Sequence, residues 1–128
     1  MNALKSLLVL ISVLLVSNGL MAQVDFIKAA DFATLIKANP KVVVIDGNKA
    51  KTFATSHIKG AININHMDLY QKGDIEGLLL PAEDMAKFFG NLGINEKSEV
   101  VIYDDGTLKY NTRLYYILKY LGAGNVKL

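Results

Sequence analysis

Two short, uninterrupted apolar runs, each closing on an aspartate, constrain the fold of this chain more than any other feature. Residues 41–46 read KVVVID, and residues 100–104 read VVIYD. β-Branched runs without polar alternation are typical of strands that are covered on both faces, as in a parallel sheet. Two shorter segments, 61–64 and 125–128, predict further strands of the same sheet.

The segments between these runs have the apolar spacing of amphipathic helices. Pro81 begins the middle helix, and Gly90 and Gly93 mark its end. Gly122 ends the last helix. The apolar helical positions are Phe32, Leu35 and Ile36, then Met85, Phe88, Phe89 and Leu92, then Leu114, Ile117, Leu118 and Leu121. Strands alternating with helices predict an α/β domain whose mainly parallel sheet is flanked by helices on both faces.

Composition excludes several classes of protein. The length of 128 residues fits about one domain, and 52% hydrophobic with 20% charged residues is ordinary for a globular fold. The absence of cysteine excludes a disulfide scaffold, a thiolate metal site, an iron–sulfur cluster and a cysteine nucleophile. A net charge of +2 is too small to predict a nucleic-acid partner. No residue pattern calls for a cofactor.

Residues 1–22 have the layout of a secretory signal peptide. Lys5 supplies a positive start, residues 7–16 read LLVLISVLLV, and Ala22 is the small residue before the predicted cleavage point. The alternative is a membrane anchor, but a spanning helix needs about 20 apolar residues. We therefore expect cleavage after Ala22, a folded domain over residues 23–128, a periplasmic or secreted location, and no stable membrane anchor after cleavage.

Polar loops follow both apolar runs, at the strand ends where open α/β sheets bind ligands. Residues 46–48 read DGN, and residues 104–109 read DDGTLK just before the last helix. The start of that helix favours an anion, but Asp104 and Asp105 place negative charge where an anion would arrive. We expect these acids to cap the helix instead.

The chain resembles the rhodanese-like domains. VVID at 43–46, a short helix with Phe53 and HIKGAI at 57–62 are similar to the first signature of that family. VVIYD at 100–104, followed by Arg113, Gly122 and Asn125, is similar to the stretch with the active-site loop. LPAE at 80–83 and LGI at 92–94 most resemble the N-terminal domain of two-domain thiosulfate or mercaptopyruvate sulfurtransferases.

This resemblance implies that the loop after the second apolar run lacks the cysteine that family members use for sulfur transfer. In the family a cysteine in this loop carries sulfane sulfur as a persulfide, and its position corresponds to Asp104. The corresponding loop is Asp104, Asp105, Gly106, Thr107, Leu108 and Lys109. A carboxylate cannot carry sulfane sulfur, so we expect the chain alone to be inactive. The resemblance implies structural roles for the family-signature residues, which are Asp46, His57, Gly60 and Arg113.

Two departures from the family pattern carry expectations. Asn48 stands where family members commonly have an arginine, which removes an ion pair around Asp46. The family also continues beyond the position of Leu128, so we expect the domain to be incomplete at its C-terminus. An incomplete domain would leave an apolar strip in water, which predicts poor solubility or association.

Other side chains leave alternatives open. His57, His66 and Asp68 lack regular ligand spacing, so we predict no metal site. Arg113 opposes the helix dipole and would pair with Asp104 or Asp105, or contact a second domain. Hydrolysis by aspartate and histidine is the weakest alternative. The tyrosines of the last strand and helix form core, rim or a partner surface; they are Tyr103, Tyr110, Tyr115, Tyr116 and Tyr120.

Two functions of different class follow from the resemblance. The first is the non-catalytic half of a sulfurtransferase whose partner is a second, cysteine-containing rhodanese domain, in the same protein or in a partner chain. The parent protein would transfer sulfane sulfur from thiosulfate or 3-mercaptopyruvate to cyanide or a thiol. The second is a stand-alone, catalytically dead binding module in the cell envelope.

Overall fold

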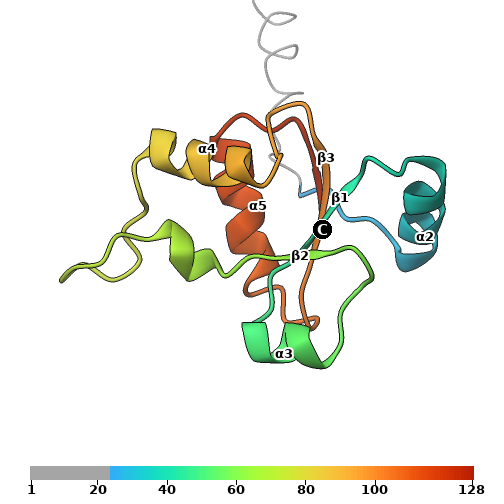
Figure 1. Ribbon diagram of the computed structural model, residues 1–128, viewed down its shortest axis with the longest axis horizontal. Helices are drawn as coiled ribbons and strands as arrows, with labels where there is room; N and C mark the ends of the chain where they lie inside the picture. Colours follow the sequence, from blue (N-terminus) through green and yellow to red (C-terminus); the bar gives the residue numbers. More distant parts are fainter. Residues whose placement is uncertain (1–23) are drawn as a thin grey trace, which may run out of the picture.

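The computed structural model describes residues 24–128, which fold around one parallel sheet (Figure 1). The strands are β1 (Val43–Asp46), β2 (Ile62–Asn63), β3 (Glu99–Tyr103) and β4 (Asn125–Lys127). The helices are α2 (Ala29–Ala38), α3 (Ala50–Thr55), α4 (Ala82–Asn91) and α5 (Asn111–Tyr120), with a 3-10 helix, η1 (His66–Leu69), before α4. The predicted α/β class and parallel sheet are confirmed.

The strand order places both apolar runs at the centre of the sheet. The order is β2-β1-β3-β4, and every pair is parallel. Val44 pairs with Val101, and Ile45 pairs with Ile102. The chain leaves β1 for β2 on one side and then crosses to β3 on the other side. This reversal creates a topological switch point between the carboxyl ends of β1 and β3.

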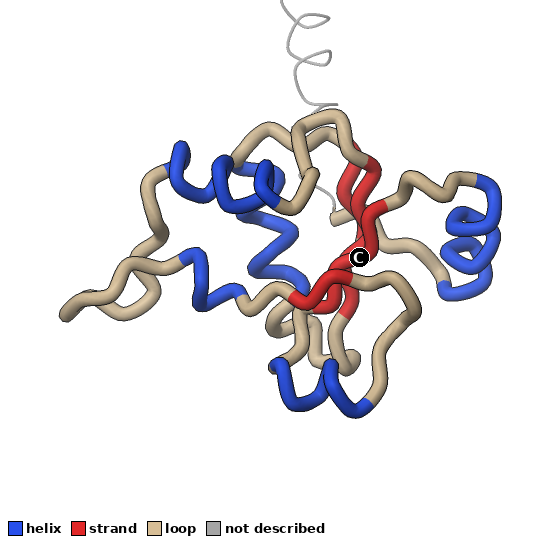
Figure 2. Tube along the Cα trace, viewed as in Figure 1, coloured by secondary structure: helices blue, strands red, loops and turns tan. Residues whose placement is uncertain are grey.

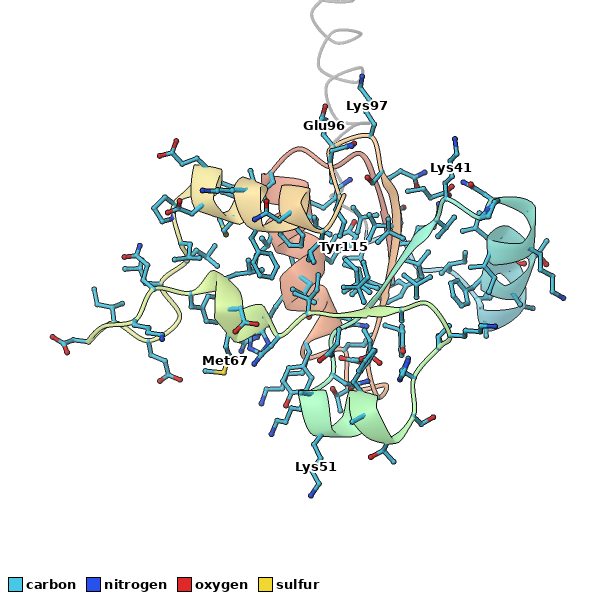
Figure 3. The ribbon with its side chains drawn as sticks, in the orientation of Figure 1. Lys41, Lys51, Met67, Glu96, Lys97 and Tyr115 are labelled. Carbon is cyan, nitrogen blue, oxygen red and sulfur yellow. The ribbon has the colours of Figure 1, made fainter. Side chains whose placement is uncertain are left out.

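Helices α4 and α5 lie together on one side of the sheet, as the tube in Figure 2 shows. Alternation along the strands turns Ile45, Val100 and Ile102 toward this side, and all three are fully buried. Tyr115, on α5, is 3% exposed and belongs to the same core (Figure 3). The helices contribute further buried residues to this core, namely Met85, Phe89, Leu114, Ile117 and Leu118.

The opposite side of the sheet is covered more thinly. Helix α2 lies on that side in Figure 1, yet none of its residues is buried. Val44 and Val101 point to this side, and Glu99 forms an ion pair of 3.0 Å with Lys127 there. Helices therefore lie on both sides, but the packed core is on the side of α4 and α5.

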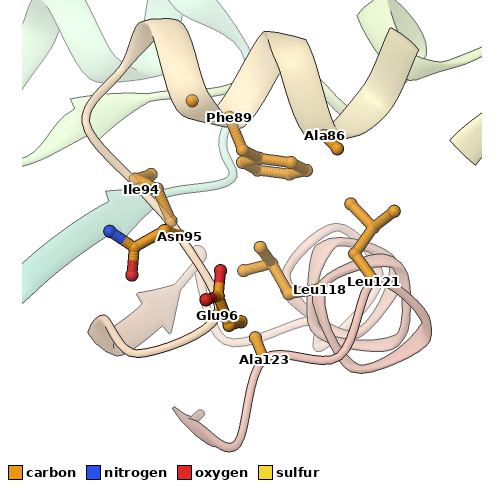
Figure 4. Close-up of a pocket in the computed structure, with 9 residues that line it drawn as sticks. Ala86, Phe89, Ile94, Asn95, Glu96, Leu118, Leu121 and Ala123 are labelled. Atoms are coloured by element: carbon orange, nitrogen blue, oxygen red, sulfur yellow. The ribbon is translucent and has the colours of Figure 1, made fainter. Parts of the chain in front are cut away.

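A small cavity lies between α4 and α5 (Figure 4). Its volume is about 180 Å³. The wall is mostly apolar, from Phe89, Leu118 and Leu121, with Asn95 and Glu96 adding polar groups.

Within residues 24–128, no helix combines the length and apolar character that a membrane crossing needs.

Helix boundaries differ from the sequence prediction by about one turn at most. Pro81 is the N-cap of α4 rather than its first residue, because its ψ of 145° is extended. Gly90 lies inside α4, whereas Gly93, with a φ of 76°, makes the turn that follows. Gly122 has a φ of 92° just after α5, which confirms the predicted end of that helix.

Candidate functional site

The two polar loops meet at the switch point between β1 and β3. The amide of Gly47 donates to the carbonyl of Tyr103 at 2.9 Å, which extends the strand pairing by one bond. The amide of Asp105 donates to Oδ1 of Asn48 at 3.0 Å. Loop 46–48 and loop 104–109, which the sequence predicted as a candidate site, therefore lie side by side.

The carboxylate of Asp104 forms the centre of the second loop. Each of its oxygens accepts hydrogen bonds from backbone amides of the loop and of the start of α5. The N···O distances run from 2.9 to 3.4 Å, and the donors are Gly106, Leu108, Tyr110 and Asn111. Asp104 therefore caps α5, as predicted, and also folds the loop around its own negative charge.

Asp105 has a more local role than Asp104. Its Oδ1 accepts from the Thr107 hydroxyl at 2.9 Å, and its side chain is exposed. Leu108 has a φ of 59°, and the preceding Gly106 has a φ of 91°. A leucine in the left-handed region is costly, and the Leu108 amide bond to Asp104 helps to hold it there. The prediction that both acids cap the helix is therefore right for Asp104 and wrong for Asp105.

In the first loop, Asn48 stands where family members commonly have an arginine, and it forms several hydrogen bonds there. Asn48 is 6% exposed, its amide donates to Oδ1 of Asp46 at 2.8 Å, and its carbonyl accepts from Nδ2 of Asn63 at 2.8 Å. Asn63 also donates to the Asp46 carbonyl at 3.0 Å. The two asparagines join the ends of β1, β2 and β3, a role that sequence reasoning missed.

Asp46 is fully buried, which fits the structural role implied by the resemblance. Its Oδ2 has no hydrogen-bond partner among residues 24–128. Tyr103 is the strand partner of Asp46, and its hydroxyl accepts from the Ile58 amide at 2.9 Å. Burial, and then the Asp46 carboxylate, raise the pKa of Tyr103 to about 12. Tyr103 is therefore a neutral phenol at physiological pH.

His57 and Gly60 belong to the turn that leads from α3 to β2. The Nδ1 of His57 lies 2.8 Å from the Phe53 carbonyl, and the two rings stack at 3.9 Å. Gly60 has a φ of 84°, which explains why a glycine stands there. Both residues stabilise the backbone of this turn. In the described part, His57 forms no hydrogen bond to loop 104–109.

Arg113 does not form the predicted ion pair with Asp104 or Asp105. Its Nη1 donates to the Tyr70 hydroxyl at 3.1 Å. The ion-pair alternative was wrong because backbone amides already surround Asp104, and Asp105 faces Thr107. The other alternative, contact of Arg113 with a second domain, stays a prediction. In residues 24–128, the one ion pair within 4.0 Å joins Lys127 to Glu99.

Around Arg113 the structure gathers a second group of polar and aromatic residues that the sequence did not reveal. The His66 ring stacks on Tyr110 with centroids 5.4 Å apart and meets the edge of Tyr70 at 5.6 Å. Lys109 places its ammonium 5.7 Å from the centre of the Tyr110 ring. We call these five residues the His66 cluster. Its signal was hidden because its members come from segments far apart in the chain.

The described residues contain no group of three or more histidine, aspartate or glutamate side chains that could hold a metal ion. His66 and Asp68 both belong to η1, whereas His57 stacks on Phe53 near α3.

The predicted signal peptide at 1–22 lies outside the described residues. In the two loops, both oxygens of the Asp104 carboxylate already accept hydrogen bonds from backbone amides. The sequence supplies no thiol there.

The family model of the rhodanese-like domain matches residues 28–128. Among solved structures, the chain is similar to the Escherichia coli 3-mercaptopyruvate sulfotransferase SseA, with a TM-score of 0.70 and 23% identity. That match covers 81% of this chain and 44% of SseA. No curated protein matches the chain.

Two further structures have the same fold. A structure named YnjE matches with a TM-score of 0.70 and 18% identity, over 81% of this chain and 26% of its own. An uncharacterized protein from Saccharomyces cerevisiae matches with a TM-score of 0.59 and 19% identity, over 84% and 85% of the two chains. The chain thus spans less than half of SseA and YnjE. Because the family model covers most of the sequence, this chain belongs to the rhodanese-like domain family.

Proposed function

We propose that this chain is the non-catalytic, N-terminal half of a secreted or periplasmic sulfurtransferase-like protein. One observation carries the proposal: the Asp104 carboxylate occupies the amide-lined centre of the loop, at the position that the family resemblance gives to the persulfide-forming cysteine. The sequence contains no cysteine and therefore no thiol. The catalytic cysteine must then come from a second rhodanese domain.

The proposed reaction of the parent protein follows sulfurtransferase chemistry. A thiolate of the second domain attacks the outer sulfur of thiosulfate, sulfite leaves, and a persulfide remains. Cyanide or a thiol then takes the outer sulfur and restores the thiolate. This domain packs against the catalytic one and forms a wall of the substrate cleft. 3-Mercaptopyruvate is the second candidate donor.

The chemical test exchanges the two loop acids for cysteine, one at a time. We expect the unmodified chain to release no thiocyanate from thiosulfate and cyanide. We expect Asp104→Cys to take up one sulfur atom from thiosulfate, because the loop amides that now bind the carboxylate would stabilise a thiolate and lower its pKa. Asp105→Cys is the matched control, since its side chain lies outside those amides.

Thiocyanate release by the unmodified chain, with contaminants excluded, would show that it is catalytic. Equal sulfur uptake by both cysteine variants would show that the amides around Asp104 have no special effect. Mass spectrometry of the intact chain reports the added sulfur, and iodoacetamide alkylation against pH reports the thiol pKa of each variant.

The domain partner and the location need separate tests. A cysteine-bearing rhodanese segment encoded in the same gene supports the two-domain proposal, whereas a stop codon soon after Leu128 favours the stand-alone binding module. Secretion predicts that the N-terminus of the processed protein is Gln23. An unprocessed chain in the cytoplasm would contradict the proposed location.

A further inference from the structure

The His66 cluster concentrates positive charge without a local counter-charge. Lys109 and Arg113 are exposed, and neither has a carboxylate within 4.0 Å among residues 24–128. Both flank the start of α5, where the helix dipole is also positive. Arg113 is the only arginine of the sequence, and its guanidinium donates to a hydroxyl, that of Tyr70, and not to a carboxylate.

The nearby acids do not balance this charge. Asp104 already accepts from amides on both of its oxygens, and Asp105 is turned to Thr107. Asp68, on η1, acts on His66 from a distance and forms no ion pair in the described part. In the described part of the chain the two cations therefore have no ion-paired carboxylate, which leaves both available to an anionic ligand.

His66 adds a polar ring nitrogen that no group of residues 24–128 binds. The side chain is 8% exposed, and its Nδ1 is buried without a hydrogen-bond partner in residues 24–128. Its ring lies against Tyr110, near whose ring the Lys109 ammonium lies, and against Tyr70, whose hydroxyl binds Arg113. Buried polar atoms usually have partners, so an unused one at this place points to a group that is not part of the chain.

We propose that the His66 cluster binds a tetrahedral oxyanion, namely sulfate, phosphate, or the sulfonate or phosphate end of a small molecule. The cluster combines four kinds of polar group that can bind such an anion: a guanidinium, an ammonium, a phenol hydroxyl and an imidazole. A carboxylate offers two oxygens to such a set, whereas a tetrahedral oxyanion offers three or four. Charge-assisted bonds from Arg113 and Lys109 would supply most of the affinity.

This site shares Lys109 with loop 104–109 but uses its side chain and not the amides of the loop. The loop amides bind Asp104 and are not free for an external anion. The oxyanion site does not rest on the proposed function, because it needs neither a cysteine nor a second domain.

The test follows the two histidines of the full chain by NMR during titration with sodium sulfate. His57 is the internal reference, because it stacks on Phe53 and belongs to a different turn. We expect saturable shifts of the His66 ring signals with half-saturation in the millimolar range, and little change at His57. Sodium chloride at equal ionic strength and sodium acetate should give no saturable shift.

Charge-removing variants locate the site. Arg113→Gln and Lys109→Gln should each weaken sulfate binding about tenfold. Lys51→Gln is the matched control, because Lys51 points away from α3 into solvent (Figure 3) and should leave binding unchanged. Arg113→Lys should fall between the native chain and Arg113→Gln, since it keeps the charge and loses the guanidinium fork.

Methanesulfonate distinguishes the two sources of the oxyanion. Tighter binding of methanesulfonate than of sulfate supports an organic ligand, and the reverse supports an inorganic ion. Absence of a saturable His66 shift with either probe would overturn the proposal. Equal binding of acetate would overturn the tetrahedral class, and equal loss in Lys51→Gln would show general charge screening.

Discussion

At the scale of single residues, Asp104 determines what the loop backbone binds. The carboxylate accepts from four amides of its own chain, so these amides need no external anion. Within residues 24–128, the hydrogen bonds that the Asp105 side chain accepts, one residue later, come from the loop residue Thr107. The two acids look equivalent in the sequence and differ in their energetic importance.

We expect Asp104→Asn to lower the free energy of unfolding by about 2 kcal/mol, because it removes the charge from several charge-assisted hydrogen bonds. Asp105→Asn, whose side chain is exposed, should cost at most about 0.5 kcal/mol. Urea denaturation of both variants measures the difference. Equal losses would contradict the central role of Asp104.

A second residue-scale prediction concerns His66 and pH. Burial first, then Arg113 and Lys109, lower the pKa of His66 below 6.5, while Asp68 opposes them. The unfolded chain therefore takes up this proton at a higher pH than the folded chain does. Stability from neutral His66 is complete above about pH 6.5 and is lost as the pH falls from there toward the lower pKa of the folded state.

An NMR titration in sulfate-free buffer checks the pKa of His66 directly. Denaturation between pH 7.5 and pH 5 should show a loss of stability that His66→Gln reduces. A pKa of His66 at or above 6.5 would contradict the prediction. Added sulfate should raise this pKa if the anion lies near the ring.

At the scale of elements, the close approach of β1 to α5 fixes how the two loops meet. Gly47 follows β1, and a Cβ there would lie 3.3 Å from the Asn111 amide nitrogen and 3.4 Å from the Tyr110 carbonyl carbon. These are backbone atoms, which cannot rotate away as a side chain can. The contact places the start of α5 over the end of β1.

We therefore expect Gly47→Ala to destabilise the fold by about 1–3 kcal/mol, because crowding forces the backbone to shift. Gly73→Ala is the matched control, since a Cβ there meets nothing within 4 Å. Denaturation measures the stabilities, and hydrogen exchange at the amides of α5 locates the effect. An unchanged Gly47→Ala variant would show that α5 can move without cost.

The strands were predictable from the sequence because the pattern that marks them is local, although the energy that stabilises them comes from tertiary burial. Continuous apolar runs such as 43–46 need burial on both faces, whichever partners supply it. The loop contacts were not predictable in the same way. The Asn48 bond to the Asp105 amide spans 57 residues, and the Arg113 bond to Tyr70 spans 43. One of the two alternatives for Arg113 was pairing with the acids nearest in sequence, and the tertiary contact with Tyr70 contradicts it.

At the scale of the whole molecule, apolar side chains remain exposed outside the core. Tyr116 and Tyr120 are 56% and 66% exposed and lie one helical turn apart on α5. Ile75, in the segment between η1 and α4, is 67% exposed. Association through an apolar strip of an incomplete domain was expected from the sequence, and it stays a prediction.

We expect the chain to self-associate at high concentration through the Tyr116 and Tyr120 face of α5, because burial of this face removes apolar area from water. Tyr116→Glu with Tyr120→Glu should lower the weight-average mass in sedimentation equilibrium. Leu92→Ser, at a position 38% exposed after α4, is the control. A native chain that stays monomeric at every concentration would contradict the prediction.

The amide bonds to Asp104 have one more consequence. A solute that orders a loop is lost on dilution, whereas an acid tethered within the same loop keeps a constant effective concentration. Desalting and dialysis should therefore leave segment 104–109 as ordered as before. The anion that the loop amides bind is part of the chain. The surface that the loop presents to another protein therefore does not depend on which small anions are in solution.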